Sequence, residues 1–240
     1  MFLNITAISF GISTILSTVI SWRSFLVWKR QKENQVSKAF FQVLLSLTFY
    51  MGIRAIASFL FVDFPDILNI IYILSHVYLG IAIAYLAKFA VLNFFNLSSA
   101  NYTFRVVLAL FVSDVILNIF LPNQPHFNPQ VNIIEWGTNK YLGIYHTLLL
   151  WTVCLGVAVL FIYTALKNWQ DRIIRSRSLI MASGVLMSIF VVIPRNVFRD
   201  PLFILISDVG YILTFGIILF AINYPKEQKA LGSIDKNFNS

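Results

Sequence analysis

Charged residues are scarce in this sequence. Asp, Glu, Lys and Arg make up 12% of its 240 residues, whereas about 25% is usual for a soluble domain. Hydrophobic residues reach 58%. This composition excludes a soluble globular domain and a disordered chain, and it is typical of a protein that crosses a membrane several times. The net charge of +8 does not by itself indicate nucleic acid as a partner, because the placement of the charges decides that question.

Cysteine and histidine are also rare. Cys154 is the single cysteine, so an intramolecular disulfide is excluded. The three histidines are His76, His126 and His146, and no HxxxH pair or zinc-type Cys/His spacing occurs among them. A seven-helix zinc hydrolase would need several converging histidine and acid ligands. We therefore expect no metal and no enzymatic activity, and no motif of an intramembrane protease is present.

Long apolar runs make up most of the sequence. A helix that crosses the hydrocarbon needs about 20 mainly apolar residues. The sequence predicts an all-α fold: one polytopic membrane bundle of seven transmembrane helices. The first expected partner of this bundle is the lipid bilayer around it. The predicted spans are residues 5–28, 40–62, 67–93, 104–121, 141–166, 176–194 and 202–224. Residues 225–240 form a short tail on which we expect no folded output domain.

The basic residues predict the orientation of the bundle. Of the 18 Lys and Arg residues, 14 flank the first, third and fifth loops or lie in the tail. Only Lys140, Arg195 and Arg199 lie on the other side, and Arg54 lies within a span. Since Lys and Arg accumulate in cytoplasmic loops, the N-terminus is expected outside and the C-terminus in the cytoplasm. The predicted location is the plasma (inner) membrane, as a multi-pass integral protein.

Five ionisable residues lie within the predicted spans. They are Arg54, His76, Asp114, His146 and Asp208, each on a different helix. Such residues are costly in a membrane, usually face the bundle interior and usually pair. Arg54 is permanently charged and needs a carboxylate, for which both Asp114 and Asp208 are candidates. The sequence leaves this choice open.

Polar neighbours at helical spacing accompany these residues. Tyr50, Tyr72, Asn118 and Tyr211 each lie three or four residues from one of them. The pattern predicts polar stripes that line a cavity open to the outside, where a small ligand binds. The alternative is that the buried charges only hold the helices together, since a buried ion pair can serve packing specificity alone.

The longest predicted loop lies on the outside. It spans residues 121–141, and its three prolines and four asparagines exclude a regular helix through most of it. The stretch "VNIIEWG", residues 131–137, is interpreted as a short interfacial turn. Trp136 is expected at the lipid headgroups, where tryptophan is enriched.

One stretch of the last span, "SDVGYILTFGIIL" at 207–219, resembles the seventh helix of microbial rhodopsins. In that family the aspartate belongs to the counterion of the retinal Schiff base, and a lysine four residues later binds retinal. Position 212 is Ile here, and the span contains no lysine. We therefore expect no covalent retinal and no other cofactor.

A broader resemblance covers most of the chain. The stretches "YLGIAIAYLAKFAVLNF" (78–94), "KYLGIYHTLLLWTVCLGVAVLFIYTALKN" (140–168) and "RIIRSRSLIMASGVL" (172–186) resemble the seven-helix N-terminal sensor module of bacterial histidine kinases. The resemblance includes Gly143, His146 and Arg175. It implies a sensor module without its kinase, which would signal through a separate protein.

Three functions are compatible with these features. The first is a stand-alone membrane sensor or receptor-like protein, with a small ligand bound from outside and a signalling partner at the basic cytoplasmic loops. The alternative is a small transporter or ion-conducting protein that uses Asp114 and Asp208 as proton or cation sites. The third is a structural or assembly subunit of a membrane complex.

Overall fold

The computed structural model describes residues 4–121, 123–197 and 200–224, and it confirms the all-α prediction. Seven helices are long and apolar enough to cross a membrane. The predicted tail, 225–240, lies outside the described residues. The helices are α1 Ile5–Arg30, α2 Gln35–Leu60, α3 Pro65–Leu92, α4 Leu97–Phe120, α5 Lys140–Lys167, α6 Arg172–Val197 and α7 Pro201–Asn223.

Polar caps explain why several helices begin before the apolar runs predicted from the sequence. Asn34 and Asn96 accept hydrogen bonds from backbone N–H groups three residues ahead and start α2 and α4. A side-chain acceptor at this position satisfies an N–H group that has no partner within the helix. The fourth helix therefore starts at Leu97 instead of about residue 104. Pro65 and Pro201 occupy the first turns of α3 and α7, where proline loses no hydrogen bond.

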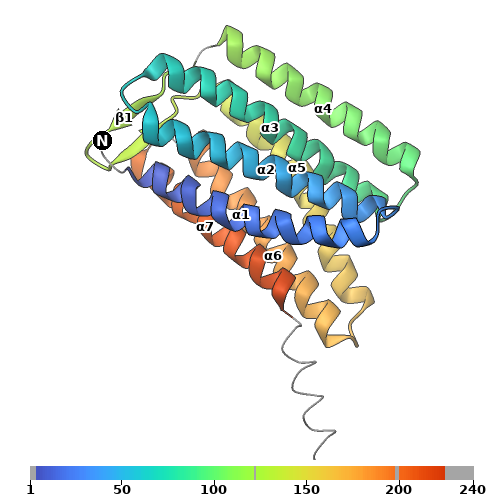
Figure 1. Ribbon diagram of the computed structural model, residues 1–240. Coiled ribbons are helices and arrows are strands. Elements are labelled where there is room, and N and C mark those ends of the chain that lie inside the picture. Colours follow the sequence, from blue (N-terminus) through green and yellow to red (C-terminus); the bar gives the residue numbers. More distant parts are fainter. Residues whose placement is uncertain (1–3, 122, 198–199, 225–240) are drawn as a thin grey trace, which may run out of the picture.

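Six of the helices form a closed ring, and α4 lies outside it. Around the ring, α1 contacts α2, α2 contacts α3, α3 contacts α5, α5 contacts α6, α6 contacts α7 and α7 contacts α1. Helix α4 packs mainly on α3, with a small contact to α5, and it is the least buried of the seven (Figure 1). The ring therefore encloses an interior that α4 reaches only from the side.

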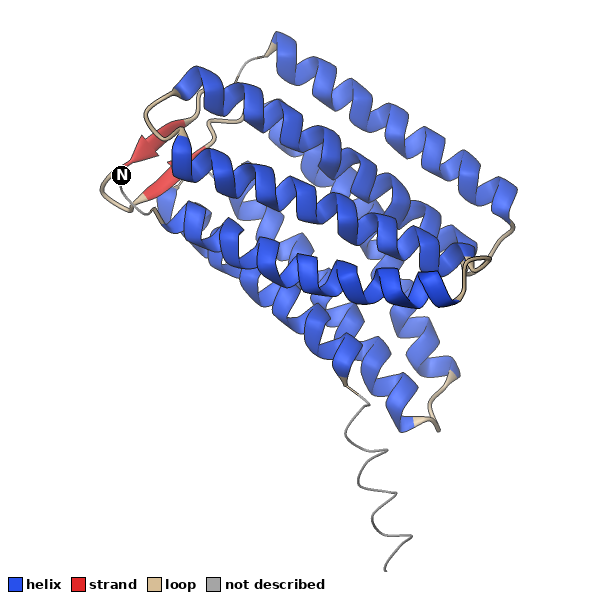
Figure 2. Cartoon of the chain, in the orientation of Figure 1, coloured by secondary structure: helices blue, strands red, loops and turns tan. Residues whose placement is uncertain are grey.

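A short β-hairpin lies at one end of the bundle, between α4 and α5 (Figure 2). Strands β1 His126–Asn128 and β2 Ile133–Glu135 pair antiparallel. Ile133 and Ile134 are fully buried, so the hairpin is packed into the protein and does not extend into solvent. We call this the hairpin end of the bundle; the loops that follow α1, α3 and α5 lie at the opposite, basic-loop end.

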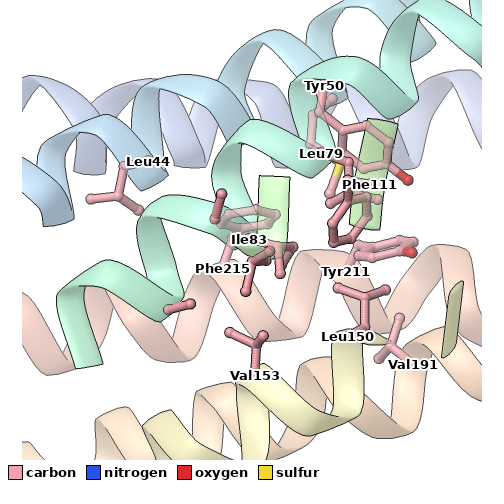
Figure 3. Packing of buried hydrophobic residues seen from close by; sticks show 14 of the residues in the cluster. Leu44, Tyr50, Leu79, Ile83, Phe111, Leu150, Val153, Val191, Tyr211 and Phe215 are labelled. Carbon is pink, nitrogen blue, oxygen red and sulfur yellow. The ribbon is translucent and has the colours of Figure 1, made fainter. Parts of the chain in front are cut away.

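The hydrophobic core runs along the ring (Figure 3). Leu79 and Ile83 of α3 meet Leu150 of α5 and Phe215 of α7 in a single cluster. The closest approach of α3 and α4 occurs at Gly80, where an added Cβ would lie 2.7 Å from Cβ of Phe111. Only glycine allows the two helices to come this close, so Gly80 determines how near α4 lies to the ring.

Candidate functional site

A cavity of about 130 Å³ lies inside the ring. Its lining comes from α2, α3, α5, α6 and α7, together with Thr138 between β2 and α5. The hairpin end of the cavity is polar and the remainder is almost wholly apolar. The polar lining at that end consists of Tyr50, Arg54, Tyr72, His76, Thr138, His146 and Tyr211.

Arg54 is enclosed by aromatic rings. Its guanidinium carbon lies 4.5 Å from the ring centroid of Trp136, 4.7 Å from Tyr72, 5.0 Å from Tyr50 and 5.7 Å from Phe10. The side chain is 1% exposed. A cation within about 6 Å of an aromatic face is attracted by the ring quadrupole, and more strongly where water is absent. The four rings therefore compensate part of the cost of burying this charge.

Hydrogen bonds fix the direction of the guanidinium. Arg54 Nε donates to Oγ of Ser75 at 3.0 Å, and the Ser75 hydroxyl donates to the carbonyl oxygen of Tyr72 at 2.7 Å. Nη2 of Arg54 lies 3.4 Å from Nδ1 of His76. The hydrogen bond to Ser75 holds the guanidinium at the polar end of the cavity, and His76 lies beside it.

The carboxylate partner expected for Arg54 is not found. Among the described residues no acid lies within ion-pair distance of the guanidinium, and neither Asp114 nor Asp208 pairs with it. Charged residues in a membrane usually pair, so an acid was the expected partner of this buried arginine. Instead the aromatic rings stabilise the charge, and the two acids are held elsewhere.

Asp114 of α4 meets the two histidines of the bundle interior. Its Oδ2 lies 3.3 Å from Nδ1 of His146, and the rings of His146 and His76 are 4.9 Å apart. One potential ligand atom from each of the three residues lies within 4.8 Å of the others, and all three residues are buried. We call Arg54, Ser75, His76, Asp114 and His146 the cavity cluster.

Asp208 belongs to a different cluster. Thr6 Oγ1 donates to Oδ2 of Asp208 at 2.7 Å and also accepts the backbone N–H of Ile134 at 3.0 Å. The hydroxyl of Ser9 donates to the backbone carbonyl of Asp208. Asn4 Nδ2 donates to the carbonyl of Ser58 at 2.6 Å. We call Asn4, Thr6, Ser9 and Asp208 the anchoring cluster, because it ties α1 to α2, α7 and the hairpin.

The other residues singled out from the sequence fall near these clusters. Tyr211 lines the cavity, and its ring lies 5.7 Å from that of Phe10. Asn118 donates to the backbone carbonyl of Asp114 at 2.8 Å and accepts from Asn123 at 3.2 Å, so it orders the end of α4. Tyr72 donates to or accepts from the hydroxyl of Thr138 at 2.8 Å.

Trp136 does not lie where the sequence placed it. The residue is 3% exposed and covers Arg54, and the stretch before it forms strand β2 instead of an interfacial turn. The apolar pair Ile133–Ile134 draws the hairpin into the bundle, because both side chains are fully buried. The two adjacent isoleucines, which only Glu135 separates from Trp136, were the available signal for a buried cap.

No family model, curated protein or solved structure matches the chain.

Proposed function

We propose that this protein is a seven-helix membrane receptor-like sensor, and not an enzyme, that binds a small anionic ligand in the cavity beside Arg54. The observation that carries the proposal is the environment of that arginine. A fully buried guanidinium lines the polar end of a cavity, and no described carboxylate lies within ion-pair distance. Because burial of a charge without a counter-charge is costly, a carboxylate ligand would complete the site.

The size and lining of the cavity narrow the ligand. A cavity of roughly 150 Å³ accommodates a molecule of the size of benzene, and this one measures about 130 Å³. Beyond the cavity cluster its wall consists mainly of Leu, Val, Ile and Phe side chains. The ligand class that fits is a small monocarboxylate with an apolar body of about six carbon atoms.

The same cavity favours a receptor over an ion pathway. Its polar part ends at Arg54, beneath Trp136, and toward the basic-loop end the wall becomes apolar. A proton or cation route would need polar groups through that half. A ligand that binds one packing of the helices better than another shifts their equilibrium. The signal would reach a separate protein at the basic cytoplasmic loops, as the resemblance to kinase sensor modules implies.

Benzoate binding to the protein in nanodiscs of zwitterionic lipid tests the proposal. We expect benzoate to bind measurably by calorimetry, and benzyl alcohol and benzylamine, which lack the carboxylate, to bind at least about tenfold more weakly. The substitution Arg54→Gln should weaken benzoate binding by about 10- to 100-fold, because a hydrogen bond to a charged group contributes about 1.5–3 kcal/mol.

Arg105→Gln is the matched control, since Arg105 lies exposed on α4 and its substitution removes the same charge. Its benzoate affinity should equal that of the wild type. Equal losses in both variants, or benzoate binding no stronger than that of benzyl alcohol, would overturn the proposed site.

A further inference from the structure

The three residues His76, Asp114 and His146 approach one another from three different helices. They lie on α3, α4 and α5, and one nitrogen or oxygen of each falls within 4.8 Å of the others. All three are at most 5% exposed. Two imidazoles and one carboxylate form the donor set that proteins use for zinc and related divalent transition metals.

One atom of this group lacks a partner. Asp114 Oδ1 is buried and forms no hydrogen bond with any described residue. Within the described part of the chain, its Oδ2 contacts only Nδ1 of His146, at 3.3 Å. A buried polar atom left in this way costs free energy, and the cost falls on a carboxylate oxygen beside two imidazoles. A cation between the three side chains would satisfy it.

The surroundings of His76 indicate which of its nitrogens carries the proton. Nδ1 lies 2.9 Å from the backbone carbonyl oxygen of Tyr72, and only a protonated nitrogen can donate to a carbonyl. In the neutral ring, Nε2 then carries the lone pair. A histidine that binds metal usually donates its other N–H to a carbonyl or carboxylate, and His76 has this arrangement.

We propose that His76, Asp114 and His146 form a binding site for one divalent transition-metal ion of the zinc class. Three protein ligands leave one position of a tetrahedral site open, and both histidines line the cavity. Ligand atoms of such a site are roughly 3.3 Å apart, from metal–ligand distances near 2.0 Å. Metal binding therefore requires the side chains to draw together from their present spacing.

The charge of Arg54 affects the affinity of this site for a metal ion. Its Nη2 lies 3.4 Å from Nδ1 of His76, which is the nitrogen on the side of the ring away from Nε2. The guanidinium is therefore a neighbour of the metal site and not part of it. Because like charges repel, it weakens binding of a cation, and its removal strengthens it.

Cobalt(II) is the probe that tests the proposal. The protein in nanodiscs is stripped with a chelator and titrated with Co²⁺ in the absence of any carboxylate ligand. We expect intense visible bands of four-coordinate Co²⁺ that saturate at one ion per chain and vanish when Zn²⁺ is added. His76→Gln and Asp114→Asn should each lower the affinity at least about 100-fold, whereas Arg54→Gln should raise it several-fold.

His126→Gln is the matched control, because His126 is the one other histidine of the chain and lies exposed on the hairpin. It should leave the Co²⁺ bands unchanged. A second variant, His76→Cys in a Cys154→Ala background, keeps the test informative if His76→Gln does not fold. Direct coordination through residue 76 should then add a sulfur-to-cobalt charge-transfer band in the near ultraviolet.

Three outcomes would overturn the proposal. They are the absence of a saturable Co²⁺ band, bands that persist in both His76→Gln and Asp114→Asn, and loss of the bands in His126→Gln. The first would mean that Asp114 and His146 contact each other without holding a metal. Since benzoate is absent from this titration, the result is independent of the ligand proposed for Arg54.

Discussion

The anchoring cluster and the cavity cluster lie near the same end of the bundle, yet their hydrogen bonds are arranged differently. In the anchoring cluster, the hydroxyl of Thr6 both donates to Asp208 and accepts from the backbone of Ile134. In the cavity cluster, Asp114 retains an oxygen without a hydrogen-bond partner among the described residues, and Arg54 has no acid beside it. Saturated bonding suits a joint between elements, whereas a buried oxygen without a hydrogen-bond partner, close to a cation on a cavity wall, suits a binding site.

Asp208→Ala should have the largest effect on stability. It removes the acceptor of Thr6 in a fully buried position, and we expect a loss of about 2–3 kcal/mol in the free energy of unfolding. Equilibrium unfolding in mixed micelles measures it. Asp208→Asn keeps an oxygen that accepts from Thr6 and should recover more than half of the loss. An alanine variant as stable as the wild type would contradict the anchoring role.

The fold was more predictable from the sequence than the two clusters. Hydrophobic length fixed the seven helices, because each run must match the thickness of the hydrocarbon. The hydrogen bond between Thr6 and Asp208 was not predictable. Threonine is common at the start of helices, and nothing in the sequence around Thr6 indicates a contact about 200 positions away. The role of Trp136 was missed for a similar reason: the burial of the hairpin depends on tertiary packing of Ile133 and Ile134.

Four of the five intramembrane ionisable residues lie together. Arg54 contacts His76, the rings of His76 and His146 meet edge to face, and His146 contacts Asp114. The pairing within the group was not predictable, because the sequence does not show that α4 lies outside the ring. That position turns Asp114 toward His146 and away from Arg54.

Gly80→Ala should produce the next largest effect, and it acts on the cavity cluster. The new methyl group would overlap Phe111, and overpacking of this kind costs about 1–3 kcal/mol. Phe111 in turn packs edge-on against His146 at 5.6 Å, so α4 and Asp114 should move outward and Co²⁺ affinity should fall. Unfolding and the Co²⁺ titration together measure the change.

Gly216→Ala is the control for this variant, because nothing lies within 4 Å of a Cβ at Gly216. It should be neutral or stabilise α7 by up to about 1 kcal/mol. If Gly80→Ala behaves in the same way, the close approach of α3 and α4 is not what positions Asp114.

Thr6→Val should have the smallest effect of the three. It removes the hydroxyl that joins Asp208 to the hairpin and keeps the shape of the side chain, and interhelical hydrogen bonds in membranes contribute about 1 kcal/mol. Thr18→Val is matched to it, since the Thr18 hydroxyl donates only to the carbonyl of Thr14 in its own helix. Unfolding free energies separate the two, and an equal effect would mean that Thr6 does not serve as a joint.

The place of α4 has a mechanical consequence. This helix lies at the outside of the bundle (Figure 1) and touches the ring along α3 and, to a small extent, α5, while the ring itself closes without it. Asp114 is the one member of the cavity cluster that α4 carries. A lateral tension or a change in bilayer thickness that tilts α4 would alter the distance between Asp114 and the two histidines before it strained any contact of the ring. Tilting of α4 would then move a single carboxylate relative to the two histidines and leave the packing of the other six helices unchanged.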